Sequence, residues 1–200
     1  MISSEKCSES FASDEVTYDK IYSENTYIAQ HKKGYRFNAD SMILSWFISI
    51  FLKKNNHAKG LEIGSGTGII PIILQRRGIL IDIDCIEIQK SLFKLLEYNI
   101  KQNNALNLNP VLSDFRSFSK ECENKYDIIF TNPPYHPSDT GIINPSMEKA
   151  VAKHEFNGDL KTFFELSFKI LMPKGDFFFV YPQSRIQFAL SSAENSGLYL

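Results

Sequence analysis

The chain has 200 residues, of which 43% are hydrophobic and 22% charged, so its size and composition fit one soluble globular domain. Its formal net charge of −1 excludes binding to nucleic acid through the overall field of the molecule, so any such contact needs a local basic patch. Three widely spaced cysteines, Cys7, Cys85 and Cys122, indicate neither a disulfide framework nor a zinc site, and a reducing cytoplasm is the simplest setting.

The amino-terminal segment, residues 1–17, is expected to be a disordered or poorly ordered head. Its first fourteen residues are rich in Ser and Glu and lack the apolar stretch of a signal peptide. No apolar run along the chain approaches the ~18 residues of a membrane span. We therefore expect a single domain over residues 18–200 that begins with a flap over residues 18–56.

The rest of the chain alternates strand-like and helix-like patterns. Short β-like runs between residues 20 and 30 predict a hairpin. Strands are predicted at 61–63, 79–88, 110–112, 126–131 and 176–181, and helices at 40–54, 69–77, 89–103, 160–171 and 185–193. The first of these helices has Met42, Ile43, Trp46, Phe47, Ile50 and Phe51 at helical spacing. Such alternation predicts an α/β fold, a mostly parallel sheet with helices on both faces.

The carboxyl end looks like an unfinished strand at residues 197–200. Sheets of this kind often continue with one or two more strands. We therefore expect the fold to be truncated before its last strands.

A glycine-rich turn follows the first predicted strand of the sheet. Gly64, Gly66 and Gly68 have the spacing G-x-G-x-G, whereas a dinucleotide site would need a glycine at position 69. Glu87 ends the second strand, about 20 residues downstream, where an acidic side chain accepts hydrogen bonds from ribose hydroxyls. Asp114 ends the third strand and suits either an adenine amino group or a helix cap. Asp82 and Asp84, earlier in the second strand, are interpreted as edge or surface carboxylates.

Asn132-Pro133-Pro134-Tyr135 follows the fourth predicted strand, at the sheet edge where α/β proteins place their chemistry. An amide oxygen, a proline carbonyl and an aromatic ring suit a flat ring that carries an amino group. The amino group of adenine is a poor nucleophile, so a site that methylates it must hold both N–H bonds and turn the lone pair out of the plane. The alternative is a rigid Pro-Pro turn with no chemical role.

Together these motifs resemble the class I S-adenosylmethionine-dependent amino-methyltransferases, which combine Glu62-x-Gly64-x-Gly66-x-Gly68, an acidic end to strand two and Asn-Pro-Pro-Tyr. The segments 34–41 and 153–155 are similar to those of the tRNA adenine-N6 methyltransferases, which modify the adenosine immediately 3′ of the anticodon of valine tRNA. The resemblance runs from about Tyr18 to Arg185 and implies a Rossmann-like fold. This chain lacks the carboxyl-terminal strands of that family.

The resemblance implies a role for each matching residue. Gly64, Ser65, Gly66 and Gly68 would wrap the methionine part of S-adenosylmethionine, which leaves as S-adenosylhomocysteine. Glu62 would lie near the amino group of the cofactor. Glu87 would hold the ribose and Asp114 the adenine. The flap would bring Arg36, Phe37 and Asp40 to the methionine end, although capping by Asp40 and packing of Phe37 explain these residues equally well.

In the Asn-Pro-Pro-Tyr turn, Asn132 and the carbonyl of Pro133 would accept hydrogen bonds from the target N–H groups, and Tyr135 would stack on the base. His154 would cover the site or touch RNA, although a lone histidine in a loop is more often solvated. No metal is required. The implied partner is a tRNA in the cytoplasm. The local basic patches available to contact it include His31-Lys32-Lys33 with Arg36, and Arg76-Arg77, although such charges more often form an ordinary solvated face.

The turn alone leaves other functions open. Glutamine-N5 methyltransferases of release factors and ribosomal guanine-N2 methyltransferases carry the same turn, because their target nitrogens are also planar and weakly nucleophilic. A DNA adenine methyltransferase is disfavoured by the absence of a target-recognition insertion or a strongly basic face. From other classes, a nicotinamide-dependent oxidoreductase and a non-catalytic module that binds S-adenosylmethionine or RNA are also considered.

Overall fold

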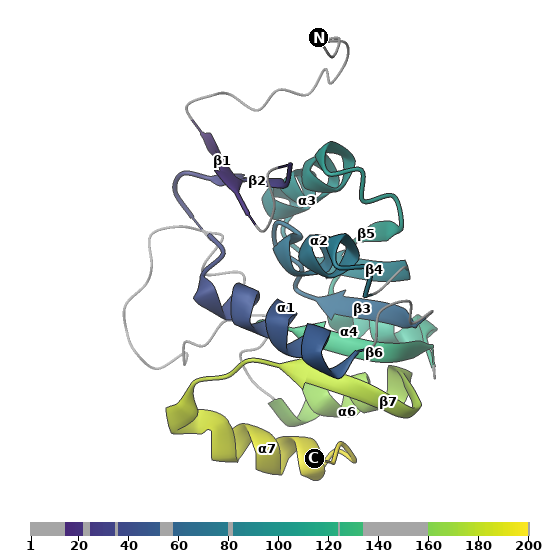
Figure 1. The fold of residues 1–200 in the computed structure, drawn as a ribbon. Coiled ribbons are helices and arrows are strands. Elements are labelled where there is room, and N and C mark those ends of the chain that lie inside the picture. Colours follow the sequence, from purple (N-terminus) through teal and green to yellow (C-terminus); the bar gives the residue numbers. More distant parts are fainter. Residues whose placement is uncertain are drawn as a thin grey trace, which may run out of the picture.

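A five-stranded parallel sheet forms the centre of the molecule (Figure 1). The computed structural model describes residues 15–21, 25–34, 36–52, 58–79, 82–123, 125–133 and 160–199. The strands run in the spatial order β5-β4-β3-β6-β7, and neighbours pair in parallel. They are β3 (Lys59–Ile63), β4 (Asp82–Glu87), β5 (Leu108–Leu112), β6 (Tyr126–Thr131) and β7 (Leu171–Phe179). The chain reverses its direction across the sheet between β3 and β6, the point at which open α/β sheets place ligands.

Helices cover both faces of the sheet (Figure 1). One face carries α1 (Ala39–Phe51), α2 (Ile69–Arg76) and α3 (Lys90–Gln102), and the other carries α4 (Phe115–Phe118), α6 (Leu160–Ile170) and α7 (Ile186–Glu194). Short 3-10 turns occupy Ser119–Glu121 and Gln183–Arg185. The predicted α/β architecture is confirmed.

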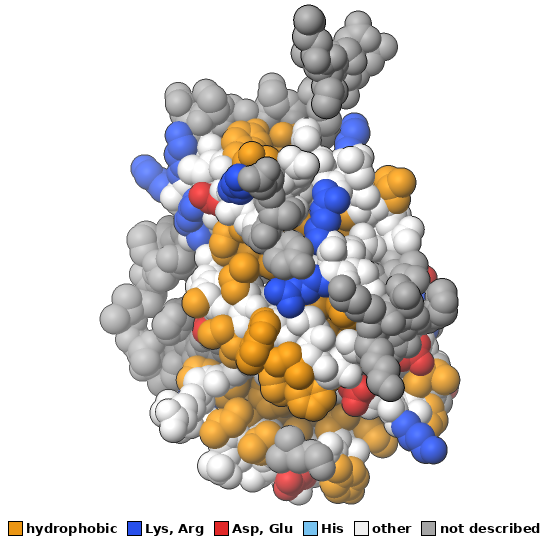
Figure 2. All heavy atoms as spheres, in the orientation of Figure 1, with side chains coloured by type: hydrophobic (Ala, Val, Ile, Leu, Met, Phe, Trp, Pro, Cys, Tyr) orange, Lys and Arg blue, Asp and Glu red, His pale blue; other side chains and the backbone are white. Residues whose placement is uncertain are grey.

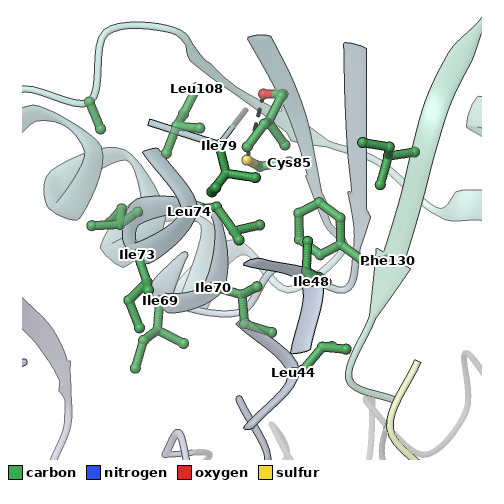
Figure 3. Close-up of a cluster of buried hydrophobic side chains, with 14 of the residues drawn as sticks. Leu44, Ile48, Ile69, Ile70, Ile73, Leu74, Ile79, Cys85, Leu108 and Phe130 are labelled. Atoms are coloured by element: carbon green, nitrogen blue, oxygen red, sulfur yellow. Dashed lines mark hydrogen bonds between the residues drawn. The ribbon is translucent and has the colours of Figure 1, made fainter. Parts of the chain in front are cut away.

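The sheet separates the two larger apolar clusters of the core, and a smaller third one lies beside α3. Side chains alternate along β6, so Ile128 and Phe130 join one cluster and Ile129 joins the other. Figure 3 shows the first cluster, in which residues of α1 and α2 such as Ile48 and Leu74 pack near Phe130. Burial on both faces explains why the strand reads as a continuous apolar run in the sequence.

A two-stranded hairpin, β1 (Val16–Lys20) with β2 (Tyr27–His31), lies over α3 and is held there by two asparagines. Asn99 accepts from the backbone N–H of Ala29 at 2.8 Å and donates to its carbonyl at 2.9 Å. Asn103 pairs in the same way with Tyr27, at 3.3 and 2.8 Å. Each side-chain amide thus bonds to the backbone of β2 as the backbone of a neighbouring strand would. A hairpin forms as predicted, but β1 lies almost entirely before residues 20–30, where the sequence indicated both strands.

Helix α1 forms where predicted, but its apolar stripe does not face the core. Its buried positions are Ser41, Leu44, Ser45 and Ile48. Figure 2 shows hydrophobic side chains on this side of the molecule, and the large ones exposed on α1 are Ile43, Trp46, Phe47, Ile50 and Phe51. Apolar residues at helical spacing predict that a helix forms, but they do not show which side of that helix packs against the core.

Two predicted boundaries near the carboxyl end are wrong. β7 begins directly after α6 and includes Pro173 and Gly175, which were expected to separate the two elements. A register shift in the pairing with β6, between Tyr126 and Ile128, accommodates these residues in the strand. Residues 197–199 form no strand. Instead Gly197, with φ 93°, caps α7, because its N–H and that of Leu198 donate to Glu194 and Ala193.

The interpretation of Asp84 as an edge or surface carboxylate is also wrong, since its exposed fraction is only 5%. Tyr126 donates to its carboxylate at 2.5 Å and Asn109 at 2.9 Å. The ammonium groups of Lys59 and Lys125 lie 3.7 and 3.5 Å away. Burial raises the pKa of Asp84, but these donors and cations outweigh burial and hold the pKa below its ordinary value.

Candidate active site

The carboxyl ends of β3, β4 and β6 lie side by side and bring the predicted motifs together. Ile63 pairs with Ile86 on one side and with Thr131 on the other. The hydroxyl of Thr131 donates to the carbonyl of Ile63 at 2.9 Å, which ties the ends of β6 and β3. The next residues along these two strands are Asn132 and Gly64. The Asn-Pro-Pro-Tyr turn, which begins at Asn132, and the glycine turn therefore start from adjacent strand ends.

The glycine turn adopts a backbone that its glycines make possible. Gly64, Gly66 and Gly68 have φ values of 71°, 55° and 80°, in the left-handed region that disfavours side chains. The N–H of Ser65 donates to Ile86 and that of Gly68 to Ser65, both at 2.8 Å, so the turn is anchored to β4 before α2 begins. The predicted strand, turn and helix are all present.

Glu87 braces this turn from the end of β4. Its two carboxylate oxygens accept from the backbone N–H groups of Gly66 and Gln89, each at 2.8 Å. These two bonds fix the side chain, and a carboxylate is the type of group that accepts hydrogen bonds from ligand hydroxyls. The carboxylate predicted to hold a ribose is thus buried and oriented beside the turn.

Glu62 lies in β3, two residues before the turn, and only 2% of it is exposed. Its Oε2 atom is buried and has no hydrogen-bond partner among the described residues. Burial raises the pKa of Glu62 well above its ordinary value, a hydrogen bond with Ser65 opposes that rise, and the charge of Glu87 adds to it. A buried carboxyl with an unused oxygen matches a ligand that brings a cationic amino group.

Asp114 forms the helix cap that was one of its two predicted roles. Its side chain accepts from the N–H of Ser117 at 3.2 Å at the start of α4. It follows β5, the strand next to β4 in the sheet. Contact with a bound adenine stays a prediction.

Asn132 is half-buried at the end of β6 and its side chain reaches across to α1. The amide Nδ2 donates to the hydroxyl of Ser41 at 3.0 Å. Pro133, the next residue, is buried. Pro134, Tyr135 and His154 lie outside the described residues, so their roles stay predictions. Sequence reasoning missed the contact with Ser41, because nothing in the spacing relates two residues 91 positions apart.

The three residues predicted to form a cofactor flap are engaged within the protein. The guanidinium of Arg36 bonds to the hairpin, at 2.8 Å to Thr17, 2.9 Å to the carbonyl of His31 and 2.9 Å to Asp19. Phe37 packs against the first apolar cluster. Asp40 accepts from the side chain of Asn38 at 2.9 Å. Their contact with a cofactor stays a prediction.

Other features of the described residues lie away from these motifs. The described residues contain no cluster of three metal-ligating side chains and no helix long and apolar enough to cross a membrane. A groove of about 890 Å³ runs along β7, with Phe51, Phe168 and Phe177 among its lining residues. None of the predicted site residues lines that groove.

Comparison with known proteins finds a family model, relatives and solved structures that are similar to this chain. The methyltransferase small domain model matches residues 45–187. The tRNA1(Val) (adenine(37)-N6)-methyltransferase of Dyadobacter fermentans is 30% identical over 61% of this chain and 50% of its own length. That of Tolumonas auensis is 28% identical over 87% of this chain and 70% of its own length. The chain thus spans about half the length of the first relative.

Among solved structures, M. jannaschii TYW2 in complex with AdoMet matches 94% of this chain and 75% of its own, at 16% identity and a TM-score of 0.63. This likeness confirms the predicted Rossmann-like fold. The family model covers well over half of the 200 residues. The chain therefore belongs to the methyltransferase small domain family.

Proposed function

We propose that this protein transfers a methyl group from S-adenosylmethionine to a planar, weakly nucleophilic nitrogen, the N6 amino group of an adenosine next to the anticodon of a tRNA. The observation that supports the proposal is the position of Asn132 directly after β6, next to the strand end from which the glycine turn starts, since Thr131 and Ile63 pair at the ends of β6 and β3. An acceptor for the target amine and a cradle for the methyl donor are thus adjacent.

The residues of the glycine turn fit the proposed cofactor. Glu62 offers to the amino group of the methionine part a buried side-chain oxygen that has no hydrogen-bond partner among the described residues. Glu87 offers oriented acceptors to the ribose. The left-handed glycines let backbone N–H groups approach the ligand. Bound S-adenosylmethionine supplies a methyl group that its sulfonium already activates, so the protein needs mainly to position the acceptor.

The acceptor nitrogen is held by the turn after β6. The Asn132 side-chain oxygen and the Pro133 carbonyl accept hydrogen bonds from the two N–H groups of the amine. These hydrogen bonds direct the lone pair of the amine nitrogen toward the methyl donor. Tyr135 stacks on the base, which leaves its loop to enter the site. The proton passes to water after transfer. These roles rest on the chemistry of the motif and on the position of Asn132.

The choice of a tRNA adenine rests on the names of the relatives and on the similarity of residues 34–41 and 153–155 to that group. The alternative groups to receive the methyl are a glutamine amide in a protein and the amino group of guanine in ribosomal RNA. Either nitrogen could be held by the same two oxygens, the Asn132 side-chain oxygen and the Pro133 carbonyl. A module that binds S-adenosylmethionine or RNA without catalysis is the alternative of another class.

The deciding experiment is a methyl-transfer assay with labelled S-adenosylmethionine and three substrates in parallel: unmodified valine tRNA, release factor and ribosomal RNA. Label in the tRNA, recovered after digestion as N6-methyladenosine, supports the proposal. Label only on protein or only in ribosomal RNA refutes the tRNA assignment. Cofactor binding with no transfer to any substrate points to the non-catalytic module.

Replacing Asn132 by alanine tests the site itself. We expect Asn132→Ala to slow transfer by about 100-fold, because one preorganised polar group in an active site is removed, and to leave cofactor affinity unchanged. Asn107→Ala is the matched control, since Asn107 is exposed next to the amino end of β5, away from the strand ends that carry the site. If both variants transfer methyl groups as fast as the parent, the proposed site is wrong.

A further inference from the structure

The basic residues of this chain are concentrated in the part that contains the hairpin, α2 and α3. Residues 15–37, 69–77 and 90–102 carry nine Lys or Arg and four Asp or Glu, whereas the rest of the chain carries 13 and 19. In Figure 2, Lys and Arg side chains predominate over the hairpin and α2, and acidic ones lie mainly toward β7 and α7. A chain with a net charge of −1 thus has one distinctly basic part.

Three lysines lie on one side of α3. Lys90, Lys94 and Lys101 are exposed, and their spacing of 4 and 7 residues places them within about 40° of one another around the helix axis. The row starts beside the proposed site, because Lys90 follows Gln89, whose N–H donates to Glu87. At about 1.5 Å per residue, it extends about 16 Å along the helix.

The hairpin places two exposed tyrosines beside this row. Lys20 pairs with Tyr27 in the hairpin register, and Tyr18 lies two residues before Lys20, so these three share one face. Tyr18 is 51% exposed and Tyr27 46%. The ring centroid of Tyr18 lies 6.1 Å from that of Tyr98, which is the neighbour of Lys94 one turn along α3. We call the following residues the basic surface: Tyr18, Lys20, Tyr27, Lys90, Lys94 and Lys101.

The basic surface is joined directly to the glycine turn. The side-chain amide of Asn99 donates to the carbonyl of Thr67 in that turn and to the carbonyl of Ala29 in the hairpin, each at 2.9 Å. One buried side chain of α3 therefore holds the hairpin against the turn. Beyond the hairpin the chain enters α1, where Ser41 contacts Asn132 at 3.0 Å. A ligand on the basic surface thus lies next to the strand ends that carry the proposed site.

The lysines of the basic surface are available to an anionic ligand. Among the residues that the structure describes, none of these four lysines forms an ion pair. The acidic residues within β1, β2 and α3 are Glu97, which is exposed, and Asp19, which is bound to Arg36 at 2.9 Å. Lysines bind phosphates through their charge, and aromatic rings stack on unpaired bases. The basic surface therefore combines the two kinds of group that bind single-stranded RNA.

We propose that the basic surface is where the substrate RNA docks, with its phosphates on the lysines and unpaired bases stacked on Tyr18 and Tyr27. The inference deepens the proposed function and rests on it, because it takes the substrate to be RNA. A row of positive charges along about 16 Å matches a partner whose negative charge repeats, as that of a phosphate backbone does. These side chains take no part in methyl transfer itself, so their loss changes RNA binding and KM but not kcat.

The double variant Lys94→Gln/Lys101→Gln tests the lysines. Binding of unmodified valine tRNA is measured over a series of salt concentrations. The slope of log Kd against log salt is expected to fall by about 1.5–2, because two phosphate contacts are lost, which corresponds to about 30- to 100-fold weaker binding at about 0.1 M salt. The KM for tRNA is expected to rise, with kcat at saturating tRNA and the affinity for S-adenosylmethionine unchanged.

Lys120→Gln/Lys169→Gln is the matched control. It removes the same charge from two exposed lysines on the other face of the sheet, one in the 3-10 turn after α4 and one in α6. Its affinity for tRNA is expected to equal that of the parent. If the two double variants bind tRNA equally well, the proposal is overturned.

Tyr27→Ala tests the stacking role of the hairpin. It is expected to weaken tRNA binding about tenfold at every salt concentration, because stacking of a base does not depend on released counterions. Tyr199→Ala is the control, since Tyr199 is 85% exposed and lies outside the basic surface. If Tyr27→Ala does not fold, Tyr18→Ala takes its place. An affinity equal to that of the parent in the folded variant overturns the stacking role.

Failure of this proposal can be told apart from failure of the proposed function. If the parent methylates valine tRNA and the lysine variant keeps its KM and its affinity, only the docking surface is refuted. If the parent instead methylates ribosomal RNA and the lysine variant binds that RNA more weakly, the tRNA assignment fails and the docking surface stands. If the lysine variant impairs only the methylation of release factor, the basic surface binds a protein and the proposal is overturned.

Discussion

Gly64 and Gly68 stand at the two ends of the glycine turn, with similar backbones and different surroundings. Their φ values are 71° and 80°. A Cβ atom on Gly64 would meet nothing within 4 Å, whereas one on Gly68 would lie 2.5 Å from Cδ1 of Leu96. Alanine at each position therefore separates the strain of the backbone from the packing of α2 against α3.

The expected free energies of unfolding differ by the packing cost. Both variants place alanine in the left-handed region, which costs about 1–2 kcal/mol. Gly68→Ala also drives a methyl group into Leu96, which is fully buried, while Ile72 lies 3.7 Å from the new atom. Overpacking of this kind costs about 1–3 kcal/mol. We expect a loss of about 1–2 kcal/mol for Gly64→Ala and about 2–5 kcal/mol for Gly68→Ala.

Urea unfolding measures both losses, followed by far-UV circular dichroism and by the fluorescence of Trp46, the single tryptophan of the chain. In the double variant Gly68→Ala/Leu96→Ala, the clashing atom is absent, so the two effects are expected to be less than additive. Equal losses for Gly64→Ala and Gly68→Ala would refute the reasoning, because they would mean that Leu96 moves aside without cost.

Two further predictions concern buried polar groups. Asn99→Asp is expected to lower the free energy of unfolding by about 3 kcal/mol or more, because a carboxylate would face the carbonyls of Ala29 and Thr67 to which the amide now donates. Urea unfolding measures this loss. A similar loss in the exposed control Gln102→Glu would contradict the prediction. Asp84 has a lowered pKa in the folded state, so its contribution to stability is present above its ordinary pKa of about 3.9 and is lost as the pH falls through the folded value. We therefore expect Asp84→Asn to lower the free energy of unfolding by about 1.5–3 kcal/mol at neutral pH and by progressively less in acid. A loss of the same size in urea titrations at neutral and acidic pH would contradict this prediction.

Local patterns were enough to predict most elements of the sheet. The run over residues 126–131 is a strand with the same bounds in the structure, because it is buried on both faces and its apolar residues are continuous. The segment that joins α6 to β7 was harder to predict, because Pro173 and Gly175 indicate a break between elements. Pairing with β6 instead incorporates them in a bulged strand.

The site was predictable where its residues are close in sequence or lie at strand ends. The glycine spacing indicated a turn that approaches a ligand, and the position of Glu87 at the end of β4 placed its carboxylate beside Gly66. The flap residues were less predictable. Arg36 is suited to a ligand by its charge, yet the neighbouring hairpin offers Asp19 and two further acceptors, and the guanidinium binds there.

The sequence by itself determined the order of the main strands and helices, because periodicity, glycine turns and proline positions act over a few residues. Only the tertiary structure decided which distant polar groups meet. Ser41 contacts Asn132 and Asn99 contacts Ala29 across separations of 91 and 70 residues. Such contacts depend on how helices are placed against the sheet, and a side-chain hydrogen bond requires an alignment within about 3.2 Å that no local pattern specifies.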